Sequence, residues 1–227
     1  MQEGLHLNNY MQDKKHEKKT KLINKLLPYL RKNGLQSIRM DEISKVMEIS
    51  RATLYKYFAT KEEIVQFIVD GFIEYLKDLT YSSLDSSQSF GTRFLKIFEQ
   101  TISLAVYFSD TLLQDIETSY PDLFDRFDKT MREREDKILA FYKEGIQEGF
   151  FNEINGRLLI KQDEILRDLF DIKYLMTNQF TVQQVLYDYF QLKKLQLFKP
   201  EKLVVIDDKM IMPVLEYLTQ KISKNIL

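Results

Sequence analysis

Side chains that could perform acid-base, nucleophilic or metal chemistry are scarce in this sequence. The chain of 227 residues has no cysteine, and its only two histidines, His6 and His16, stand in the polar first segment. Thiolate nucleophiles, disulfides and cysteine-ligated metals are thus excluded, and a buried site would have no imidazole to act as a general base. The sequence also lacks a glycine-rich phosphate loop, a Gly-Xaa-Ser-Xaa-Gly elbow and a His-Glu-Xaa-Xaa-His pair.

Carboxylates do cluster, but without the neighbours that catalysis needs. Glu133, Glu135 and Asp136 form one group, and Asp163 and Glu164 form another. Each group falls on a polar helical face beside lysine or arginine, where solvated ion pairs explain it. We therefore predict a protein that is not an enzyme and that uses no cofactor and no metal.

Charge is divided unevenly along the chain, although the formal net charge is only −1. Residues 1–61 hold thirteen Lys and Arg against six Asp and Glu, a balance of +7, whereas residues 62–227 have a balance of −8. A basic amino-terminal module is typical of proteins that bind a polyanion, because each neutralised phosphate releases condensed counterions. A solvated helix face is the alternative that charge alone leaves open.

Composition favours helices joined by short connections. Glycine (7) and proline (4) both fall well below average usage, so hairpin turns and Gly/Ser linkers are not expected. Apolar residues make up 44% of the chain, enough for a sizeable core, yet no apolar stretch approaches the roughly 18 residues that cross a bilayer. We expect an all-α protein, located in the cytoplasm and without a membrane partner.

Helical periodicity in the first 80 residues predicts four consecutive helices. The first carries apolar residues from Leu22 to Leu30 and ends at Asn33-Gly34, and Pro28 is expected to kink or divide it. Two short helices follow at 40–47 and 51–58, and a long helix begins at residue 61. Two short helices joined by a tight turn, the second of them basic, form a helix-turn-helix suited to the major groove of DNA.

The stretch from Ile43 to Ile64, ISKVMEISRATLYKYFATKEEI, resembles the signature of TetR-type repressors, and the similarity covers roughly residues 17–68. This resemblance implies an all-α fold in which a helix-turn-helix DNA-binding domain precedes a larger helical-bundle regulatory and dimerisation domain. We accordingly expect a flexible basic tail over residues 1–16, the DNA-binding domain over 17–62, and the ligand-binding and dimerisation domain over 63–227.

Three positions depart from the family pattern. Glu48 stands in the turn where glycine is frequent, so either it tolerates a strained backbone or the turn is reshaped. Arg39 stands where a capping threonine is frequent and could contact a phosphate directly. Ala52 replaces a frequent glycine but is still small enough to let the helix approach base edges. These changes affect the recognised DNA sequence more than the fold.

The resemblance also implies roles for residues around the second short helix. The residues expected to contact base edges are Arg51, Ala52, Thr53 and Lys56. Those expected to contact DNA phosphates are Arg39, Ser50, Tyr55, Tyr57 and Lys61. Those expected in the core are Ile43, Ile49, Leu54 and Phe58. Ser50 also suits a helix cap, and the two tyrosines could simply pack with their hydroxyl groups at the surface.

Helical spacing continues through the larger segment, with helices expected over 157–170 and 181–198 among others. The aromatic side chains that could line an effector pocket are Phe94, Phe98, Tyr107, Phe108, Phe124, Phe127, Phe141 and Tyr142. The residues expected at a dimer surface are Leu158, Ile165, Leu169, Val182, Val185, Leu186 and Tyr189. Both sets could instead form the chain's own core, and residues 199–206 could be extended or helical.

These patterns together predict a homodimeric, sequence-specific DNA-binding regulator of transcription. Its expected partners are double-stranded operator DNA and a small-molecule effector, hydrophobic or aromatic in character, that releases a repressor from the operator. A non-catalytic helical interaction protein, or a DNA-bound protein with a non-transcriptional partner, is the alternative. The sequence leaves open the effector, the operator, the regulated genes and the choice between repression and activation.

Overall fold

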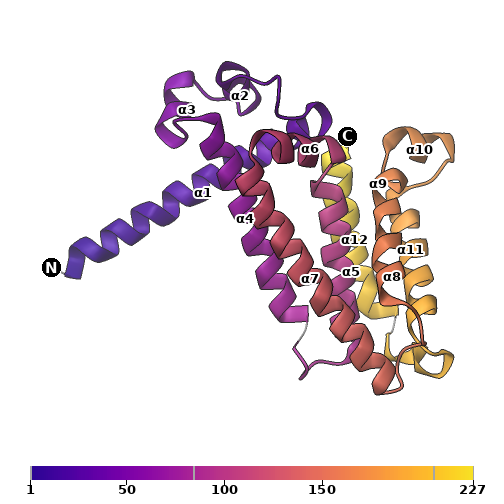
Figure 1. The fold of residues 1–227 in the computed structure, drawn as a ribbon. Coiled ribbons are helices and arrows are strands. Elements are labelled where there is room, and N and C mark those ends of the chain that lie inside the picture. The colour runs from indigo at the N-terminus through magenta and orange to yellow at the C-terminus, as the bar shows by residue number, and fades with distance from the viewer. Residues whose placement is uncertain (1, 84, 207, 227) are drawn as a thin grey trace. The chain divides into compact units, whose positions relative to one another are not determined.

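The computed structural model describes the backbone of residues 2–83, 85–206 and 208–226 and the side chains of residues 14–78, 85–206 and 209–223. Within these ranges the regular elements are all helices, and the only β-type pairing is an isolated antiparallel bridge between Phe151 and Phe198 (Figure 1). The chain forms two compact units. The first comprises Met1–Phe72 and Ser109–Arg126, and the second comprises Ile73–Phe108 and Phe127–Leu227. The all-α class expected from the sequence is confirmed.

The first unit contains the helix-turn-helix. Its elements are α1 (Gln2–Asn33), α2 (Met40–Val46), α3 (Arg51–Tyr57), the first part of α4 (Lys61–Ser83), α6 (Asp110–Ser119) and the start of α7 (Pro121–Gln147). α2 and α3 have seven residues each, too few to be stable alone in water. They are held by fully buried apolar side chains, among them Ile43, Leu54 and Phe58. Tertiary packing therefore maintains the two short helices.

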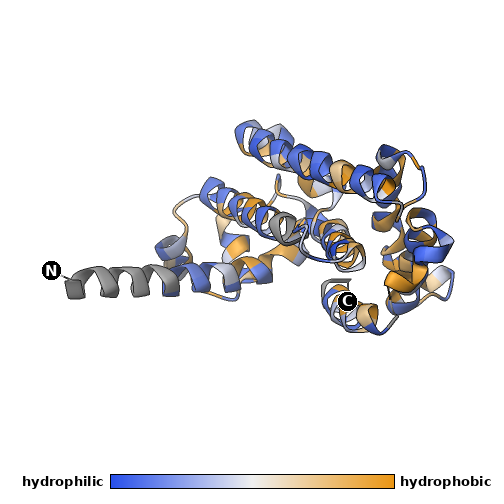
Figure 2. Ribbon diagram, turned by 90° about the horizontal axis from the view of Figure 1, so that it is seen from below, coloured by the Kyte–Doolittle hydropathy of each residue, from blue (hydrophilic) through white to orange (hydrophobic). Residues whose placement is uncertain are grey.

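The second unit is a larger helical bundle. Besides parts of α4 and α7, its elements are α5 (Phe90–Tyr107), α8 (Gly156–Gln162), the 3₁₀ turn η1 (Asp163–Ile165), α9 (Leu166–Leu169), α10 (Ile172–Thr177), α11 (Val182–Leu197), the 3₁₀ helix η2 (Pro200–Val205) and α12 (Asp208–Ile226). One apolar cluster forms its core, with Phe94, Phe141, Phe190 and Phe198 among its members. Figure 2 shows hydrophilic and hydrophobic residues alternating along single helices, as amphipathic helices require.

Short polar side chains set the starts of several helices. The side chains of Ser89, Asn155, Asp171 and Thr181 each accept a hydrogen bond from a backbone N–H in the first turn of the helix that follows. Such N-caps satisfy amide groups that the helix itself leaves without a partner. The starts of these helices are therefore determined by residues next to them in the sequence.

Several boundaries predicted for the first unit are confirmed. α1 ends at Asn33, and Gly34 has a φ of +75°, a left-handed conformation that glycine adopts without strain. α1 continues through Pro28 as one helix, so the division considered at that residue does not occur. The side chains of residues 1–13 lie outside the described ranges. The flexibility expected for residues 1–16 stays a prediction, although the backbone from Gln2 onward is assigned to α1.

Two helices were not anticipated from the sequence, and one open segment is now assigned. α6 and α10 are short, at ten and six residues, and their apolar spacing is too brief to give a clear helical period. Residues Pro200–Val205 form the 3₁₀ helix η2 instead of an extended piece, with Pro200 at its start. Val204 in this segment is 85% exposed, so the β-branched run does not form a buried strand.

Two glycines within helices give a matched stability test. An ideal Cβ built on Gly145 in α7 lies 2.1 Å from Cδ2 of Phe151, a fully buried ring, whereas one on Gly71 in α4 has nothing within 4 Å. We expect Gly145→Ala to lower the free energy of unfolding by about 2 kcal/mol through overpacking. Gly71→Ala gains helix propensity and should raise it by up to about 1 kcal/mol. Urea denaturation measures both, and equal effects would contradict the clash.

Candidate nucleic-acid interface

Local hydrogen bonds define the start of α3. Ser50 has extended backbone angles, and its Oγ accepts the Thr53 backbone N–H at 3.1 Å. The two hydroxyl groups of Ser50 and Thr53 also lie 2.8 Å apart. Ser50 is therefore the N-cap of α3. The amide groups of the first turn stay oriented along the helix axis, a geometry that attracts anions such as DNA phosphates.

α3 has one buried and one exposed face. Leu54 is fully buried, as is Phe58 directly after the helix. Arg51, Ala52 and Lys56, three of the four residues expected to contact bases, are exposed. The fourth, Thr53, is half-buried. The helix thus keeps its cationic residues in solvent while its apolar residues anchor it, as a recognition helix requires.

The aromatic residues of α3 differ in exposure. Tyr55 is 45% exposed and Tyr57 is half-buried. Ile49, expected in the core, is also only half-buried. A phenol at the surface can donate a hydrogen bond to a phosphate while its ring packs on the protein. Tyr55 has the greater access to a ligand of the two.

Glu48 occupies the turn with a left-handed backbone. Its φ is +56°, so the strained alternative raised by the sequence is the one observed. Its N–H donates to the Lys45 carbonyl at 3.0 Å, and its carboxylate accepts a hydrogen bond from the Lys25 ammonium of α1. The Lys25 ammonium lowers the pKa of the Glu48 carboxyl. These contacts hold the turn in the conformation that glycine would adopt freely.

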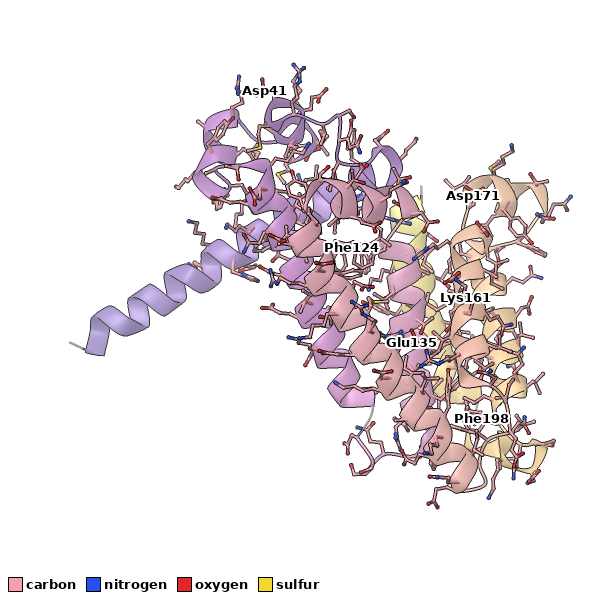
Figure 3. The ribbon with its side chains drawn as sticks, in the orientation of Figure 1. Asp41, Phe124, Glu135, Lys161, Asp171 and Phe198 are labelled. Atoms are coloured by element: carbon pink, nitrogen blue, oxygen red, sulfur yellow. The ribbon has the colours of Figure 1, made fainter. Side chains whose placement is uncertain are left out.

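Carboxylates from α2 organise the two arginines at this surface. The backbone N–H of Arg39 donates to Oε2 of Glu42 at 2.9 Å, so Glu42 supplies the cap that Arg39 lacks. The Arg39 residue is exposed. Arg51 Nε lies 2.7 Å from Oδ1 of Asp41, which is labelled in Figure 3. The sequence predicts Asp41 in the first turn of the helix at 40–47 but gives no sign that it contacts Arg51.

Lys61, expected to contact a DNA phosphate, makes hydrogen bonds within its own unit. Its ammonium donates to the carbonyl oxygens of Leu35 at 2.5 Å, Ile38 at 3.2 Å and Gln36 at 3.4 Å. Burial lowers the pKa of Lys61, and the nearby Asp115 carboxylate opposes this. All three ammonium protons have acceptors in the connection between α1 and α2. Lys61 therefore anchors this connection in the structure, and its expected contact with a DNA phosphate stays a prediction.

Asp115 of α6 completes this anchor. Its Oδ2 accepts the backbone N–H of Leu35 at 2.5 Å and of Gln36 at 3.2 Å. A Cβ on Gly34 would lie 2.3 Å from the same oxygen, so the approach requires glycine there. The Oγ of Ser109 also donates to the Arg31 carbonyl at 2.8 Å. The end of α1 and the start of α6 are thus joined by hydrogen bonds that no sequence pattern indicated.

The eight aromatic residues considered for an effector pocket are not brought together as one lining. Six are buried, namely Phe94, Phe98, Phe108, Phe127, Phe141 and Tyr142. Their rings contact other core rings, as in the pairs Phe94–Phe98 at 6.4 Å and Phe108–Phe127 at 4.7 Å between centroids. Tyr107 is half-buried, and Phe124, also half-buried, belongs to the first unit. In this structure the six buried rings pack as core.

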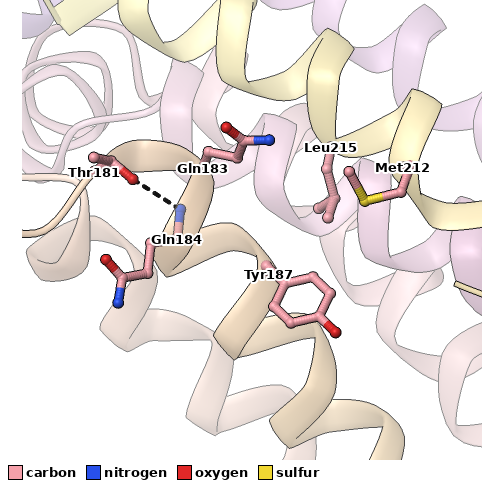
Figure 4. Close-up of a pocket in the computed structure, with 6 residues that line it drawn as sticks. All are labelled: Thr181, Gln183, Gln184, Tyr187, Met212 and Leu215. Carbon is pink, nitrogen blue, oxygen red and sulfur yellow. Dashed lines mark hydrogen bonds between the residues drawn. The ribbon is translucent and has the colours of Figure 1, made fainter.

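A surface hollow lies elsewhere in the second unit. It has a volume of about 340 Å³ and is open to solvent between α11 and α12 (Figure 4). The residues that line it are Thr181, Gln183, Gln184, Tyr187, Met212 and Leu215. The hydroxyl of Thr181 is occupied as the cap that accepts the Gln184 N–H. None of these residues was singled out from the sequence.

The residues expected at a dimer surface divide into two groups. Leu158 and Ile165 are 66% and 41% exposed, and Leu169 and Val182 are half-buried. The other three belong to the chain's own core, which is the alternative that the sequence left open, and they are Val185, Leu186 and Tyr189. α11 also exposes two large apolar side chains that were not predicted, Leu192 at 42% and Leu195 at 59%.

A buried charged network lies inside the second unit. Lys193 Nζ lies 2.8 Å from Oδ1 of Asp163, and the Tyr189 hydroxyl donates to the same oxygen at 2.7 Å. Arg134 donates to Oε1 of Gln100 at 2.6 Å and to the Thr101 hydroxyl at 2.7 Å. Burial lowers the pKa of the Arg134 guanidinium to about 10. The charge of the Asp163 carboxylate opposes this shift, so one carboxylate balances two buried cations, Lys193 by direct contact and Arg134 at longer range.

Further properties concern ions and membranes. In the ranges that the structure describes, no three His, Asp or Glu side chains are grouped so that they could hold a metal ion. None of the helices searched within those ranges is long and apolar enough to cross a membrane.

The fold and the exposed, capped, cationic α3 define a class of protein: a helix-turn-helix DNA-binding unit joined to a helical bundle. Residues 29–67 match the family profile described as bacterial regulatory proteins, tetR family. The chain is also 24% identical over 158 residues to an uncharacterized HTH-type transcriptional regulator, YvaF, of Bacillus subtilis (strain 168), which covers 66% of this chain and 80% of that protein.

Solved structures show the same fold. The ketosteroid transcriptional regulator KstR2 of Mycobacterium tuberculosis superimposes with a TM-score of 0.61 and 18% identity, over 80% of this chain and 95% of that one. A Rhodococcus sp. protein assigned to the TetR-family transcriptional regulators gives 0.55 and 10%, over 79% and 98%. The family profile therefore identifies a DNA-binding segment of the tetR type at residues 29–67, and the solved structures show that about four fifths of the chain shares their fold.

Proposed function

We propose that this protein is a transcriptional regulator, a cytoplasmic homodimeric repressor that binds an operator of two inverted half-sites through α3. Arg51, Ala52, Thr53 and Lys56 contact base edges in this proposal. The phosphate contacts come from Arg39, Ser50, Tyr55 and Tyr57. The observation that carries the proposal is the division of α3, in which Leu54 is fully buried while Arg51 and Lys56 are exposed.

A twofold dimer is part of the proposal because two recognition helices must enter successive major grooves about one helical turn apart. Exposed apolar side chains on α8 and α11 support a partner surface there, with Leu158 at 66%, Leu195 at 59% and Leu192 at 42% exposure. A partner would remove these side chains from water, which favours association.

A small apolar effector is proposed to bind within the second unit and to release the DNA. The hollow between α11 and α12 supports such a site, because the apolar and aromatic side chains of Tyr187, Met212 and Leu215 form part of its lining. KstR2, a protein of this fold, is described as a ketosteroid transcriptional regulator, and ketosteroids are apolar small molecules. An effector acts by favouring the dimer geometry that does not fit the operator.

The proposal is tested by selecting bound duplexes from a random-sequence library and then measuring binding by fluorescence anisotropy at several salt concentrations. We expect an enriched inverted repeat and a slope of log affinity on log salt of about −2 or steeper, since each neutralised phosphate contributes about −0.9. No enriched sequence and a slope near zero would favour a protein-interaction module instead. Apolar acids and hydrophobic cations added to the complex then test for release.

A further inference from the structure

The contact between Asp41 and Arg51 joins the two helices of the helix-turn-helix at their exposed side. Asp41 lies in the first turn of α2, and Arg51 is the first residue of α3. Arg51 Nε and Asp41 Oδ1 are 2.7 Å apart, and the two side chains are 62% and 49% exposed. The neighbouring carboxylate, Glu42, instead caps α2 by accepting the Arg39 N–H. Asp41 therefore has no capping task and is paired with the first residue of α3.

The atoms used in this contact leave the other end of the guanidinium available. A guanidinium has five N–H groups, and the ion pair with Asp41 is closest at Nε, the nitrogen nearest the side-chain stem. The two terminal nitrogens form a fork that matches the O6 and N7 acceptors of guanine in the major groove. Adenine offers N7 beside an N6 donor, so it accepts only one of the two bonds.

We propose that Asp41 is a positioning residue that holds Arg51 for end-on recognition of a guanine in the operator, an inference that rests on the proposed contact of α3 with DNA. The long arginine side chain loses rotamer freedom when it binds a base, and a carboxylate that restricts it beforehand reduces that loss. The ion pair is weak while solvated but strengthens when DNA excludes water around it.

The negative charge of Asp41 should weaken binding to DNA in general, so its benefit must lie in discrimination between sequences. A carboxylate at a DNA-binding surface repels phosphates, so it weakens binding to DNA of any sequence. Its presence beside Arg51 is explained if operator DNA gains more binding free energy from the oriented guanidinium than DNA of any sequence loses through repulsion by the carboxylate. Removing the charge should therefore lower discrimination while leaving general affinity unchanged or higher.

The test uses the duplex enriched by the wild-type protein and copies in which single guanines are replaced by 7-deazaguanine, which lacks N7. Wild-type protein should lose about tenfold in affinity at one guanine in each half-site. Asp41→Asn should lose less than about threefold there and should bind random-sequence DNA at least as tightly as wild type. Glu62→Gln is the matched control, because it removes the same charge from the first turn of α4. It should keep the full tenfold sensitivity.

The outcomes separate this inference from the function on which it rests. If Asp41→Asn keeps the wild-type sensitivity to 7-deazaguanine while Arg51→Ala loses it, Asp41 does not position Arg51 and the inference is overturned. If Arg51→Ala binds all duplexes as wild type does, the proposed contact of α3 with DNA fails as well. Equal loss of sensitivity in Asp41→Asn and Glu62→Gln would show a general charge effect and would also overturn the inference. Circular dichroism confirms that each variant is folded.

Discussion

Replacing both exposed cations of α3 with glutamate, in the variant Arg51→Glu/Lys56→Glu, is expected to abolish binding to the enriched duplex. The affinity of each α3 for its half-site should fall at least about 100-fold. The reversal removes the proposed base contacts, each worth about 1–3 kcal/mol, and places two carboxylates against the phosphate backbone. Arg51 and Lys56 are exposed, so the substitutions should leave the core intact. Gel-shift and anisotropy titrations at fixed salt measure the loss.

A matched control separates the position of the charges from their number. Lys143→Glu/Lys173→Glu changes the net charge by the same amount at exposed residues of α7 and α10 in the second unit. This variant should bind the enriched duplex within about threefold of wild type, because only charges near the phosphates release counterions on binding. Equal losses in the two variants would mean that α3 is not the DNA-binding surface.

The buried ion pair of the second unit gives the other large prediction. Asp163→Asn keeps the shape of the side chain but leaves the Lys193 ammonium, which is 5% exposed, and the buried Arg134 without a carboxylate. Removing one partner of a buried pair costs about 3–5 kcal/mol because the remaining charge stays desolvated. We expect the free energy of unfolding to fall by about 3 kcal/mol, as measured by urea denaturation.

The adjacent carboxylate is the natural control for this change. Glu164 pairs with Lys161 at 2.6 Å, but the two side chains are 56% and 73% exposed. Glu164→Gln should therefore change the free energy of unfolding by less than about 1 kcal/mol. The contrast tests burial, since the two variants remove the same charge at consecutive positions. A similar loss in both would contradict the assignment of Asp163 to a buried network.

The recognition surface was largely predictable because its signals are local. Ser50 before a short basic helix predicts an N-cap, and the structure confirms it. The spacing of Leu54 and Phe58 places them on one face, and Arg51 and Lys56 fall on the other. Even a seven-residue helix allows its buried and exposed faces to be predicted, because the direction of each side chain follows from helix geometry alone.

The roles of individual polar groups were less predictable. Lys61 follows a cap and precedes an acidic first turn, a pattern equally consistent with phosphate binding and with the hydrogen bonds it makes to Leu35 and Ile38. Its partner Asp115 is separated by more than fifty residues, and no local rule connects the two. The pairing of Arg51 with Asp41 crosses a turn whose shape depends on the φ of +56° at Glu48.

The sequence by itself determined the all-α class, the helix-turn-helix and the cationic face of α3, because helical period, caps and charge are properties of neighbouring residues. Only the tertiary structure decided which apolar faces meet. The residue types of Phe94 and Tyr189 suit a pocket, a dimer surface or a core equally well. Their burial depends on the helices packed around them, which only the structure shows. The same holds for Asp163, whose carboxylate is a surface group or a buried counter-ion depending on whether Lys193 of α11 packs against it.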